Sequence, residues 1–495
     1  MHRSDGFAAD SPKVRQAASQ DTAIWWIRRD LRLADNPALL AAAEHQYLIP
    51  VYIHEPDDDL GAASAWWLHH SLLALQQTLC KLGSNLILRQ GRAHEVLDSL
   101  IKDNGVTAVY WNRQYSPTQR ARDSQIKRTL RERGLRVESF NSHLLLEPWQ
   151  NTRDGHPYKV FTPFWKACLK LGIDHAPHSA PTQLRPTPRL NSARLEALNL
   201  LPRSPWDGGL CSTWNVGELA AWQQLQTFLT RHLHDYPEGR NRPAEPGSSR
   251  LSPHLAFGEI SPRQIVYAVR AQQHAHPATS DESVRIFLSE LGWREFGYHL
   301  LYHHPATIQE SLNPRWCVLH WPEVDNTYWQ AWIRGQTGIP LVDAGMRELW
   351  HTGWMHNRVR MNVASLLTKN MLIPWQYGER WFADTLVDFD LASNVQGWQW
   401  TAGCGADAAP YFRIFNPVLQ GEKFDPQGDY VRRWVPELAH LPPRWIHRPW
   451  EAPAPVLNAA GIRLGHDYPY PVVDLAASRT RALEFFAALK RGPEE

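Results

Sequence analysis

Short apolar runs and longer amphipathic segments alternate along the first part of the chain. Strands are expected at residues 23–27, 47–53, 85–88, 107–111 and 135–140. Helices are expected between them, at 38–44, 64–82 with Ser64 as N-cap, 94–102 and 117–133. Because strands separated by helices of this length form parallel sheets covered on both faces, residues 22–143 are predicted to fold as a doubly wound, Rossmann-like α/β domain.

The pattern becomes irregular and then purely helical further along the chain. Residues 144–215 contain repeated prolines, which break long elements and predict a connector that runs over the surface. Helices are then expected at 218–233, 262–273, 282–302, 327–334, 339–352, 356–369 and 377–382. The predicted organisation is a flexible N-terminal lead at 1–21, the α/β domain, the connector, and an all-α domain at 216–491.

Composition places the chain among soluble globular proteins. Of its 495 residues, 43% are hydrophobic and 21% are charged, and its length calls for more than one packed unit. The sequence shows no apolar run long enough to cross a bilayer and no signal-peptide core near Met1. Its five cysteines lie far apart, without the spacing of a zinc site. We expect a cytoplasmic monomer with no membrane span, disulfide framework or bound metal.

Charge and aromatic content narrow the picture only slightly. The formal net charge is +2, so nucleic-acid binding would need a local basic face rather than the whole molecule. The chain also contains 24 tryptophans, most of which are expected to fill a large helical core. The remaining tryptophans are candidates for chemistry.

One segment has the composition of a phosphate site. Residues 247–261 place small hydroxyl residues and Arg250 before prolines that start helices. Backbone N–H groups and hydroxyls at a helix entrance form a cradle for a pyrophosphate, although the same composition is typical of an ordinary N-cap. No G-x-G-x-x-G follows the first strand, so the usual dinucleotide fingerprint of the α/β fold is missing. A nucleotide cofactor is therefore expected outside the α/β domain.

Several motifs follow one another along the chain, namely WIRRDLRLADN at 26–36, FTPFW at 161–165, ELGWREF at 290–296 and a dense set between 335 and 425. Together they make the chain resemble the DNA photolyase and cryptochrome family over nearly its whole length, and the members that repair cyclobutane pyrimidine dimers in particular. The resemblance implies an antenna domain followed by an FAD-binding domain. It also implies light-driven repair of DNA by electron transfer from photoexcited reduced FAD.

The family's FAD site can be carried over residue by residue. The phosphate end and its surroundings would be formed by Tyr236, Ser248, Ser249, Arg250, Leu251, Ser252 and Phe287. The isoalloxazine would be lined by Asn357, Arg360, Asp388, Asp390 and Asn394. Arg360 and Asp388 can form a buried ion pair beside the ring, with a purely structural salt bridge as the alternative. Asp390 can accept a hydrogen bond from the flavin N3–H, and the amide of Asn394 can face N5.

The resemblance also implies a pocket for a flipped-out dimer and the DNA around it. Its residues would be Arg240, Glu290, Trp293, Arg294, Asn357, Arg358, Met361, Trp400 and Gln420. Trp293 and Trp400 would sandwich the pyrimidines while Glu290 contacts their polar edges, because enzymes that flip bases hold them by stacking and hydrogen bonds. Glu290 and Trp293 are three residues apart on an expected helix, which puts both on one face.

Three tryptophans match the family's electron-transfer chain. Trp398, Trp375 and Trp321 would run from the flavin to the surface and complete the catalytic candidates together with Glu290 and Asn394. Tryptophan is the most readily oxidised common side chain, so a row of them can reduce a photoexcited flavin. Three ordinary core tryptophans are the structural alternative.

Two residues bear on which reaction is catalysed. Asn394 favours repair, because related cryptochromes often have Asp or Cys at that position. Trp354 is expected where enzymes that repair (6-4) photoproducts carry a proton-donating His, which favours cyclobutane dimers. The competing function is a cryptochrome-type blue-light photoreceptor without repair activity.

A second, antenna chromophore is also expected from the resemblance. It would be a folate, such as methenyltetrahydrofolate, or a deazaflavin. The best-known folate site uses an acidic residue in the segment 118–123, where this chain has Gln119. Glu147 is the alternative folate ligand.

Overall fold

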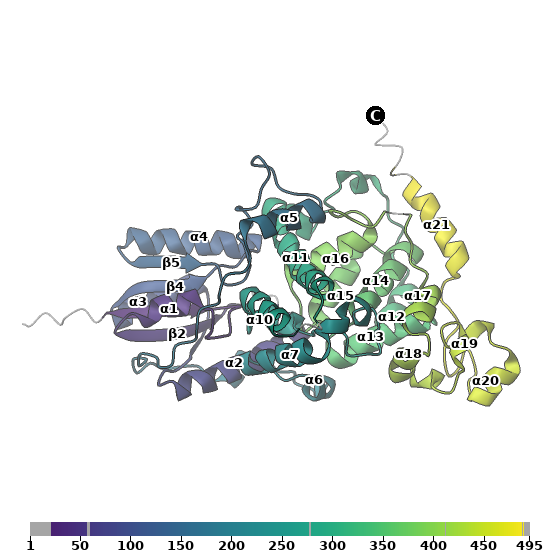
Figure 1. Ribbon diagram of the computed structural model, residues 1–495, viewed down its shortest axis with the longest axis horizontal. Helices are drawn as coiled ribbons and strands as arrows, with labels where there is room; N and C mark the ends of the chain where they lie inside the picture. The colour runs from purple at the N-terminus through teal and green to yellow at the C-terminus, as the bar shows by residue number, and fades with distance from the viewer. Residues whose placement is uncertain (1–20, 57–59, 277–278, 411, 488, 490–495) are drawn as a thin grey trace, which may run out of the picture.

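The N-terminal unit is built on a five-stranded parallel sheet. The computed structural model describes residues 21–56, 60–276, 279–410, 412–487 and 489, so most of the expected N-terminal lead lies outside the described residues. The strands are β1 (Thr22–Ile27), β2 (Tyr47–His54), β3 (Ile87–Gln90), β4 (Val106–Asn112) and β5 (Arg136–Phe140). Their order in the sheet is β3-β2-β1-β4-β5, which confirms the doubly wound α/β prediction. Figure 1 shows this unit at one end of the molecule and the helical unit at the other.

Helices cover both faces of the sheet, as the apolar strands require. The four helices are α1 (Pro37–Ala43), α2 (Ala62–Lys81), α3 (Ala93–Asn104) and α4 (Pro117–Glu132). Successive side chains of a strand point to opposite faces, so Trp25 packs in the cluster that contains α1 and α2 residues, and Trp26 packs in the one with α3 and α4 residues. Both indoles are almost completely buried. The sheet is therefore an inner layer between two helical layers.

The start of α2 differs from the sequence prediction. The helix begins at Ala62 after Gly61, so Ser64 is not its N-cap. The Ser64 hydroxyl is instead buried and donates to the carbonyl oxygen of Leu386 in the helical unit, 3.2 Å away. A methyl group on Gly61 would lie 2.0 Å from the carbonyl oxygen of Ala383. Gly61 and Ser64 are therefore explained by their contacts with the helical unit and not by capping of α2.

The segment between the units is more than a surface connector. It contains α5 (Phe161–Leu171), which the sequence analysis did not predict, and α6 (Gly208–Thr213). Phe161, Phe164 and Trp165 of α5 are buried in the same apolar cluster as residues of the helical unit. The proposed boundaries at 143 and 215 remain predictions.

The regular elements of the C-terminal unit are all helices among the described residues, as predicted. Its longer helices are α7 (Glu218–Arg231), α10 (Pro262–Ala275), α11 (Asp281–His303), α12 (Asn326–Ile333), α13 (Pro340–Thr352), α14 (Asn357–Ser365), α15 (Trp375–Thr385), α16 (Leu391–Ala402), α17 (Pro417–Phe424) and α21 (Leu475–Ala487). Shorter helices are α8 (Tyr236–Gly239), α9 (Ser252–Ala256), α18 (Asp429–Trp434), α19 (Pro443–Ile446) and α20 (Ala454–Ala460). A π-helical turn at Leu366–Asn370 extends α14. No helix in the described part of the chain has the length and apolar character to cross a bilayer.

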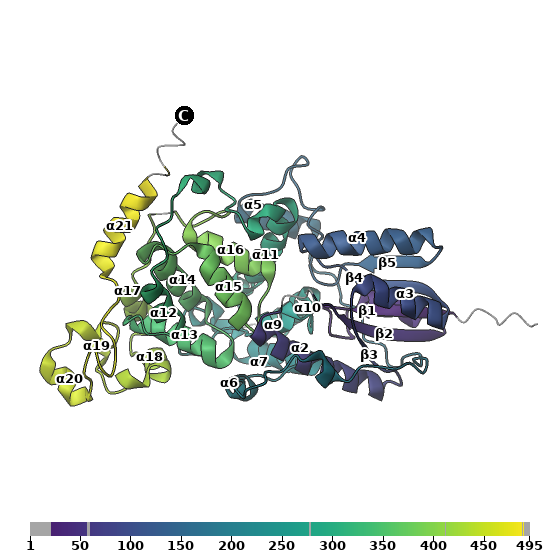
Figure 2. The same ribbon diagram turned by 180° about the vertical axis from the view of Figure 1, so that it is seen from behind.

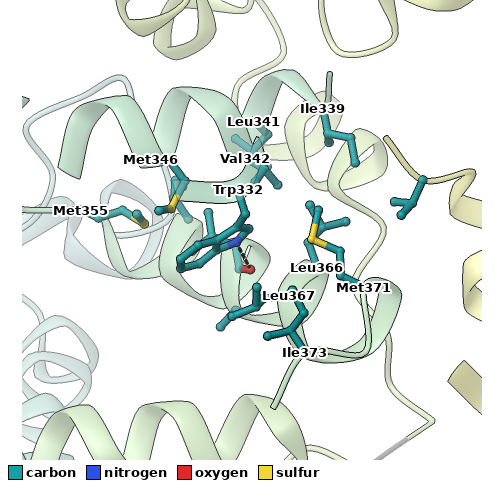
Figure 3. Close-up of a cluster of buried hydrophobic side chains, with 14 of the residues drawn as sticks. Trp332, Ile339, Leu341, Val342, Met346, Met355, Leu366, Leu367, Met371 and Ile373 are labelled. Atoms are coloured by element: carbon teal, nitrogen blue, oxygen red, sulfur yellow. Dashed lines mark hydrogen bonds between the residues drawn. The ribbon is translucent and has the colours of Figure 1, made fainter. Parts of the chain in front are cut away.

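Figure 2, seen from behind, shows α14, α15 and α16 gathered in the middle of the helical unit, while α18 to α21 lie at its far end. Trp332 of α12 lies in the hydrophobic core of the helical unit. Its indole is completely buried and donates to the carbonyl oxygen of Val363 at 3.0 Å. Figure 3 shows this indole surrounded by Val342 and Met346 on one side and Leu367 on the other.

Replacement of Trp332 tests the importance of this core. Trp332→Ala should destabilise the protein by about 3–5 kcal/mol, because it leaves a large cavity. The control is Trp350→Ala, since 64% of Trp350 is exposed on α13. Urea unfolding followed by circular dichroism should show a large decrease in the free energy of unfolding for Trp332→Ala and a small decrease for Trp350→Ala. Equal losses would mean that burial does not decide the stability of this region.

Candidate active site

The segment before α9 forms a tight loop against α8. A methyl group on Gly247 would lie 2.2 Å from the carbonyl oxygen of Gly239, so the two backbones are in direct contact. Arg250 has a φ of 53°, an uncommon left-handed conformation for a residue with a side chain. This turn leads the chain into α9 at Ser252. Leu251 shares an apolar cluster with Tyr236, the first residue of α8, and the ring of Tyr236 packs on Phe287 with 5.2 Å between centroids.

The Arg250 side chain lies between two tryptophans. Its guanidinium carbon is 4.5 Å from the centre of the Trp214 ring and 4.8 Å from that of Trp354. Its Nε is buried and has no hydrogen-bond partner among the described residues. Burial lowers the pKa of Arg250, and the attraction of Glu348 only partly opposes this. A desolvated cation with an unused donor fits the pyrophosphate of a dinucleotide such as FAD.

The position of Trp354 contradicts the role expected from the sequence. Its indole N–H donates to the Ser252 hydroxyl at 3.2 Å, and its ring is buried in the cluster shared with α2. Trp354 thus contacts Ser252 and Arg250 of the expected phosphate segment, and no contact with the lesion candidates Glu290 or Trp293 is found among the described residues. The inference from Trp354 against (6-4) photoproducts is therefore wrong in its geometry.

An ion pair joins α14 to the loop before α16. The Arg360 guanidinium contacts one carboxylate oxygen of Asp388 at 2.7 Å, and the Asp388 side chain is only 3% exposed. The other oxygen of Asp388, Oδ1, is buried without a hydrogen-bond partner among the described residues. Buried oxygens are normally hydrogen-bonded, so this one fits a donor group on a ligand.

Asp390 has less capacity left for a ligand than Asp388. It caps α16, where Oδ1 accepts a hydrogen bond from the backbone N–H of Ser393 at 2.8 Å. Its other oxygen accepts a hydrogen bond from the Tyr298 hydroxyl. Among the described residues, Asp388 thus keeps an unpaired oxygen, and the expected hydrogen bond from flavin N3–H to Asp390 stays a prediction.

Asn394 lies on α16 and is held by a residue that the sequence analysis missed. Its Nδ2 donates to both the backbone carbonyl and the side chain of Glu379, at 3.1 and 3.0 Å. Glu379 is half-buried on α15. A pattern of single residues gives no signal for such a contact, because it depends on how α15 and α16 pack.

The expected lesion pocket begins with a partly buried ion pair. Glu290 on α11 contacts Arg240 at 2.6 Å. Burial raises the pKa of Glu290, while the positive charges of Arg240 and Arg358 act in the opposite direction. Glu290 can therefore present a carboxyl group to a polar ligand edge in a site partly shielded from water.

Trp293 is supported from behind by another aromatic ring. Phe161 of α5 stacks on it with 3.8 Å between centroids and an angle of 8°. One face of the indole is thus covered, and the half-buried Trp293 keeps surface for a further flat group. Phe161 lay in a motif quoted above, but nothing in the sequence indicated this support.

Other candidates gather on α14, α16 and α17. Helix α14, which carries the exposed Asn357 and the half-buried Met361, packs against α16, which carries the half-buried Trp400. Arg358 donates to Asn241 and lies 4.7 Å from the ring of Phe424 on α17. The half-buried Gln420 is on the same helix.

Arg294 does not lie where a DNA contact requires it. Its guanidinium donates to the backbone carbonyl of His143 at 2.8 Å and approaches the His143 ring at 2.7 Å. Only 10% of the Arg294 side chain is exposed. The structure thus gives Arg294 a role in joining the two units, and the expected DNA contact is not supported.

The electron-chain candidates lie inside the helical core. Trp398 and Trp375 are almost completely buried, whereas Trp321 is partly exposed. Trp398 packs against Phe382 and Trp332, with centroid distances of 5.0 and 6.2 Å. Trp321 lies beside the buried Trp316 at 6.4 Å. Trp332 and Trp316 were not expected from the sequence as neighbours of these electron-transfer candidates.

A cleft of about 940 Å³ opens between the two units. Its walls include Arg28 and Asn112 at the carboxyl ends of β1 and β4, and Glu379 and Asp390 from the helical unit. Ligands of doubly wound sheets bind outside the carboxyl ends of strands where the strand order reverses. Gln119 lines this cleft.

Glu147, the alternative folate ligand, already has two hydrogen-bond partners inside the protein. It is buried, its Oε1 accepts from Arg113 at 2.8 Å and its Oε2 accepts from the Tyr115 hydroxyl at 2.8 Å. Both carboxylate oxygens are thus engaged inside the protein. The structure does not favour Glu147 as a folate ligand.

Comparisons with known proteins cover both units. The family model described as the FAD binding domain of DNA photolyase matches residues 287–488, and the one described as DNA photolyase matches residues 23–186. A deoxyribodipyrimidine photo-lyase of Agrobacterium fabrum is 50% identical over 474 residues, 94% of this chain and 98% of that protein. Cryptochrome-2 of Arabidopsis thaliana is 40% identical over 474 residues, 92% of this chain and 77% of that protein.

A solved structure agrees with these relatives. The crystal structure of a bacterial class III photolyase from Agrobacterium tumefaciens matches with a TM-score of 0.93 at 48% identity, covering 97% of this chain and 100% of that one. The helical unit is accordingly an FAD-binding domain. From these matches and the site described above, the chain belongs to the DNA photolyase and cryptochrome family.

Proposed function

We propose that this protein is a deoxyribodipyrimidine photo-lyase that repairs cyclobutane pyrimidine dimers in DNA with light. The observation that carries the proposal is the pairing of Glu290 and Trp293 on one face of α11. The first is held by Arg240 at 2.6 Å, and the second is backed by Phe161 at 3.8 Å. A carboxyl group beside a supported flat ring suits a base removed from the DNA stack, which needs both stacking and polar recognition.

The helical unit is proposed to bind the FAD cofactor. Arg250 and the segment 248–252 are proposed to hold the pyrophosphate, and Arg360 with Asp388 to hold the isoalloxazine. The unused Nε of Arg250 and Oδ1 of Asp388 support this orientation, because one donates and the other accepts. When bound, reduced FAD supplies light-driven transfer of one electron to the dimer and its return after the ring opens. The protein supplies orientation and excludes water.

The other DNA and electron-transfer roles are extensions of the same proposal. Trp400 and Met361 are proposed to complete the lesion pocket, and Asn357, Arg358 and Gln420 to contact the DNA around it. Trp398, Trp375 and Trp321 are proposed to carry electrons to the flavin site from the surface. The burial of the first two and the partial exposure of the third support this direction.

We place the antenna chromophore in the cleft between the units. The cleft lies at the carboxyl ends of β1 and β4 and is also lined by Asp390 of the proposed flavin site. This position supports a second chromophore near the flavin. A folate and a deazaflavin both remain candidates for its identity. A cytoplasmic location and a monomeric state are further proposals that rest on composition.

A photoreceptor without repair is the alternative function. It is favoured by the 40% identity to Cryptochrome-2 and disfavoured by the higher identity, 50%, to a deoxyribodipyrimidine photo-lyase. The two functions differ in one direct respect. Only the repair enzyme returns dimers to monomers when illuminated.

Illumination of the reduced protein with dimer-containing duplex DNA should therefore restore the pyrimidines. The dimer content should fall under blue light and stay constant in the dark, because the electron donor needs excitation. Chromatography of the digested DNA measures the remaining dimer. Equal dimer content in the light and dark samples would contradict the repair function and favour the photoreceptor.

Glu290→Gln should weaken binding to dimer-containing DNA by about ten- to a hundredfold, because a hydrogen bond to a charged group contributes roughly 1.5–3 kcal/mol. The flavin content should not change, since Glu290 contacts Arg240 and not the proposed FAD residues. The matched control is Glu282→Gln on the same helix, whose side chain is 69% exposed. Gel-shift titration measures the affinity, and loss of FAD from the Glu290 variant would show that the residue is misplaced.

A further inference from the structure

The first turn of α5 is capped by a residue from a distant part of the chain. Val160, the residue before the helix, makes no side-chain capping hydrogen bond. The N–H groups at the start of a helix have no partners within the helix. The N–H of Phe161 instead donates to Oδ2 of Asp407 at 3.2 Å, although 246 positions separate the two residues. The negative charge of Asp407 also suits the positive end of the helix dipole.

Asp407 lies in the loop that follows α16. Its φ of 48° is the left-handed conformation, which Asp and Asn adopt more readily than other residues with side chains. The loop folds back onto the end of α16, where the N–H of Ala409 donates to the carbonyl oxygen of Trp400 at 3.2 Å. Ala406 of the loop is buried in the same apolar cluster as Phe161. The loop is therefore held at Trp400 on one side and at α5 on the other.

The helix that Asp407 caps supports Trp293. Helix α11, which carries Trp293, packs against both α5 and α16, and Figures 1 and 2 show the three helices side by side. A methyl group on Gly292 would lie 2.7 Å from the ring of Trp165, so α5 fits closely against α11 next to Trp293. The Phe161 ring stacks on Trp293 with 3.8 Å between centroids. A shift of the Phe161 backbone would therefore move the surface on which Trp293 rests.

The two indoles proposed to hold the dimer lie on different helices, Trp293 on α11 and Trp400 on α16. A ligand between them gains from both faces only when their separation is fixed, because a gap of about 0.5–1 Å already removes a large part of the attraction. Asp407 links the loop held at Trp400 with the ring behind Trp293. We propose that Asp407 is a positioning residue that sets the separation of the two indoles and thereby the preference for a flipped-out dimer. The inference rests on the proposed function.

Three substitutions at Asp407 separate the hydrogen bond from the backbone conformation. Asp407→Asn keeps an acceptor oxygen and the left-handed conformation, Asp407→Gly keeps only the conformation, and Asp407→Ala keeps neither. The affinity for a duplex with one cyclobutane thymine dimer should stay within about twofold of the wild type for Asp407→Asn. It should fall about threefold to tenfold for Asp407→Gly, because one hydrogen bond is lost. Asp407→Ala should lower it at least as much as Asp407→Gly.

Undamaged duplex of the same sequence distinguishes positioning from a general loss of structure. It offers no dimer to stack, so gel-shift titration should give it the same affinity for the wild type and the three variants. The ratio of flavin to protein absorbance should also be unchanged. The matched control is Asp154→Gly, since Asp154 likewise has a positive φ of 52° but a side chain that is 91% exposed. An unchanged affinity of Asp407→Gly for the dimer duplex, or an equal decrease for both duplexes, would overturn the proposal.

A second variant tests whether the effect passes through the ring behind Trp293. Phe161→Leu keeps an apolar side chain at the start of α5 but removes the flat ring that stacks on Trp293. In the Phe161→Leu background, Asp407→Gly should cause little further decrease in dimer affinity, because the ring that Asp407 positions is already missing. A further decrease as large as the one in the wild-type background would contradict the proposed role.

Failure of this inference can be told apart from failure of the proposed function. A wild-type protein that binds the dimer duplex no better than the undamaged duplex, or that leaves dimers unrepaired in light, contradicts the function itself. A wild-type protein that prefers and repairs the dimer duplex, combined with an unaltered preference in Asp407→Gly, contradicts only the role of Asp407.

Discussion

The cation at Arg250, held between Trp214 and Trp354, is the interaction on which the site depends. Both rings belong to an apolar cluster that also contains Trp67 of α2 and Phe257 of the helical unit. The α/β unit therefore helps to bury a charge that belongs to the cofactor site. Burying a cation costs free energy unless an anion compensates, and FAD carries a pyrophosphate of the required charge. The fold therefore favours the binding of an anionic ligand beside Arg250.

The other polar residues of the site are also held by partners within the protein. The Arg360–Asp388 pair and Asn394 are the other polar groups proposed to hold the cofactor. Each is held by a partner on another element, since Asp388 pairs with α14 and Asn394 with α15. Such cross-helix partners keep polar groups oriented without a ligand. The lesion candidates Glu290 and Trp293 are supported in the same way by Arg240 and Phe161.

The sequence predicted the layout well because apolar periodicity reports directly on buried faces. The strands of the sheet and the long helices of the C-terminal unit followed from it, whereas the Arg360–Asp388 pair was implied by the family resemblance. The sequence did not predict the contacts that side chains make with residues of other elements. Ser64 contacts Leu386 instead of capping α2, Trp354 packs beside Arg250, Asp390 accepts a hydrogen bond from Tyr298 of α11, and Arg294 donates to His143. Those contacts depend on tertiary packing that no local pattern encodes.

The direct test of this account is the FAD content of an Arg250→Met variant. Methionine keeps the apolar stem but removes the charge, so FAD affinity should fall about ten- to a hundredfold. The ratio of flavin to protein absorbance should then be much lower than in the wild type and in the control Arg285→Met, whose side chain is 69% exposed. Circular dichroism should show the same fold in all three proteins. An Arg250→Met variant that keeps its FAD through purification and dilution would contradict the central role of this cation.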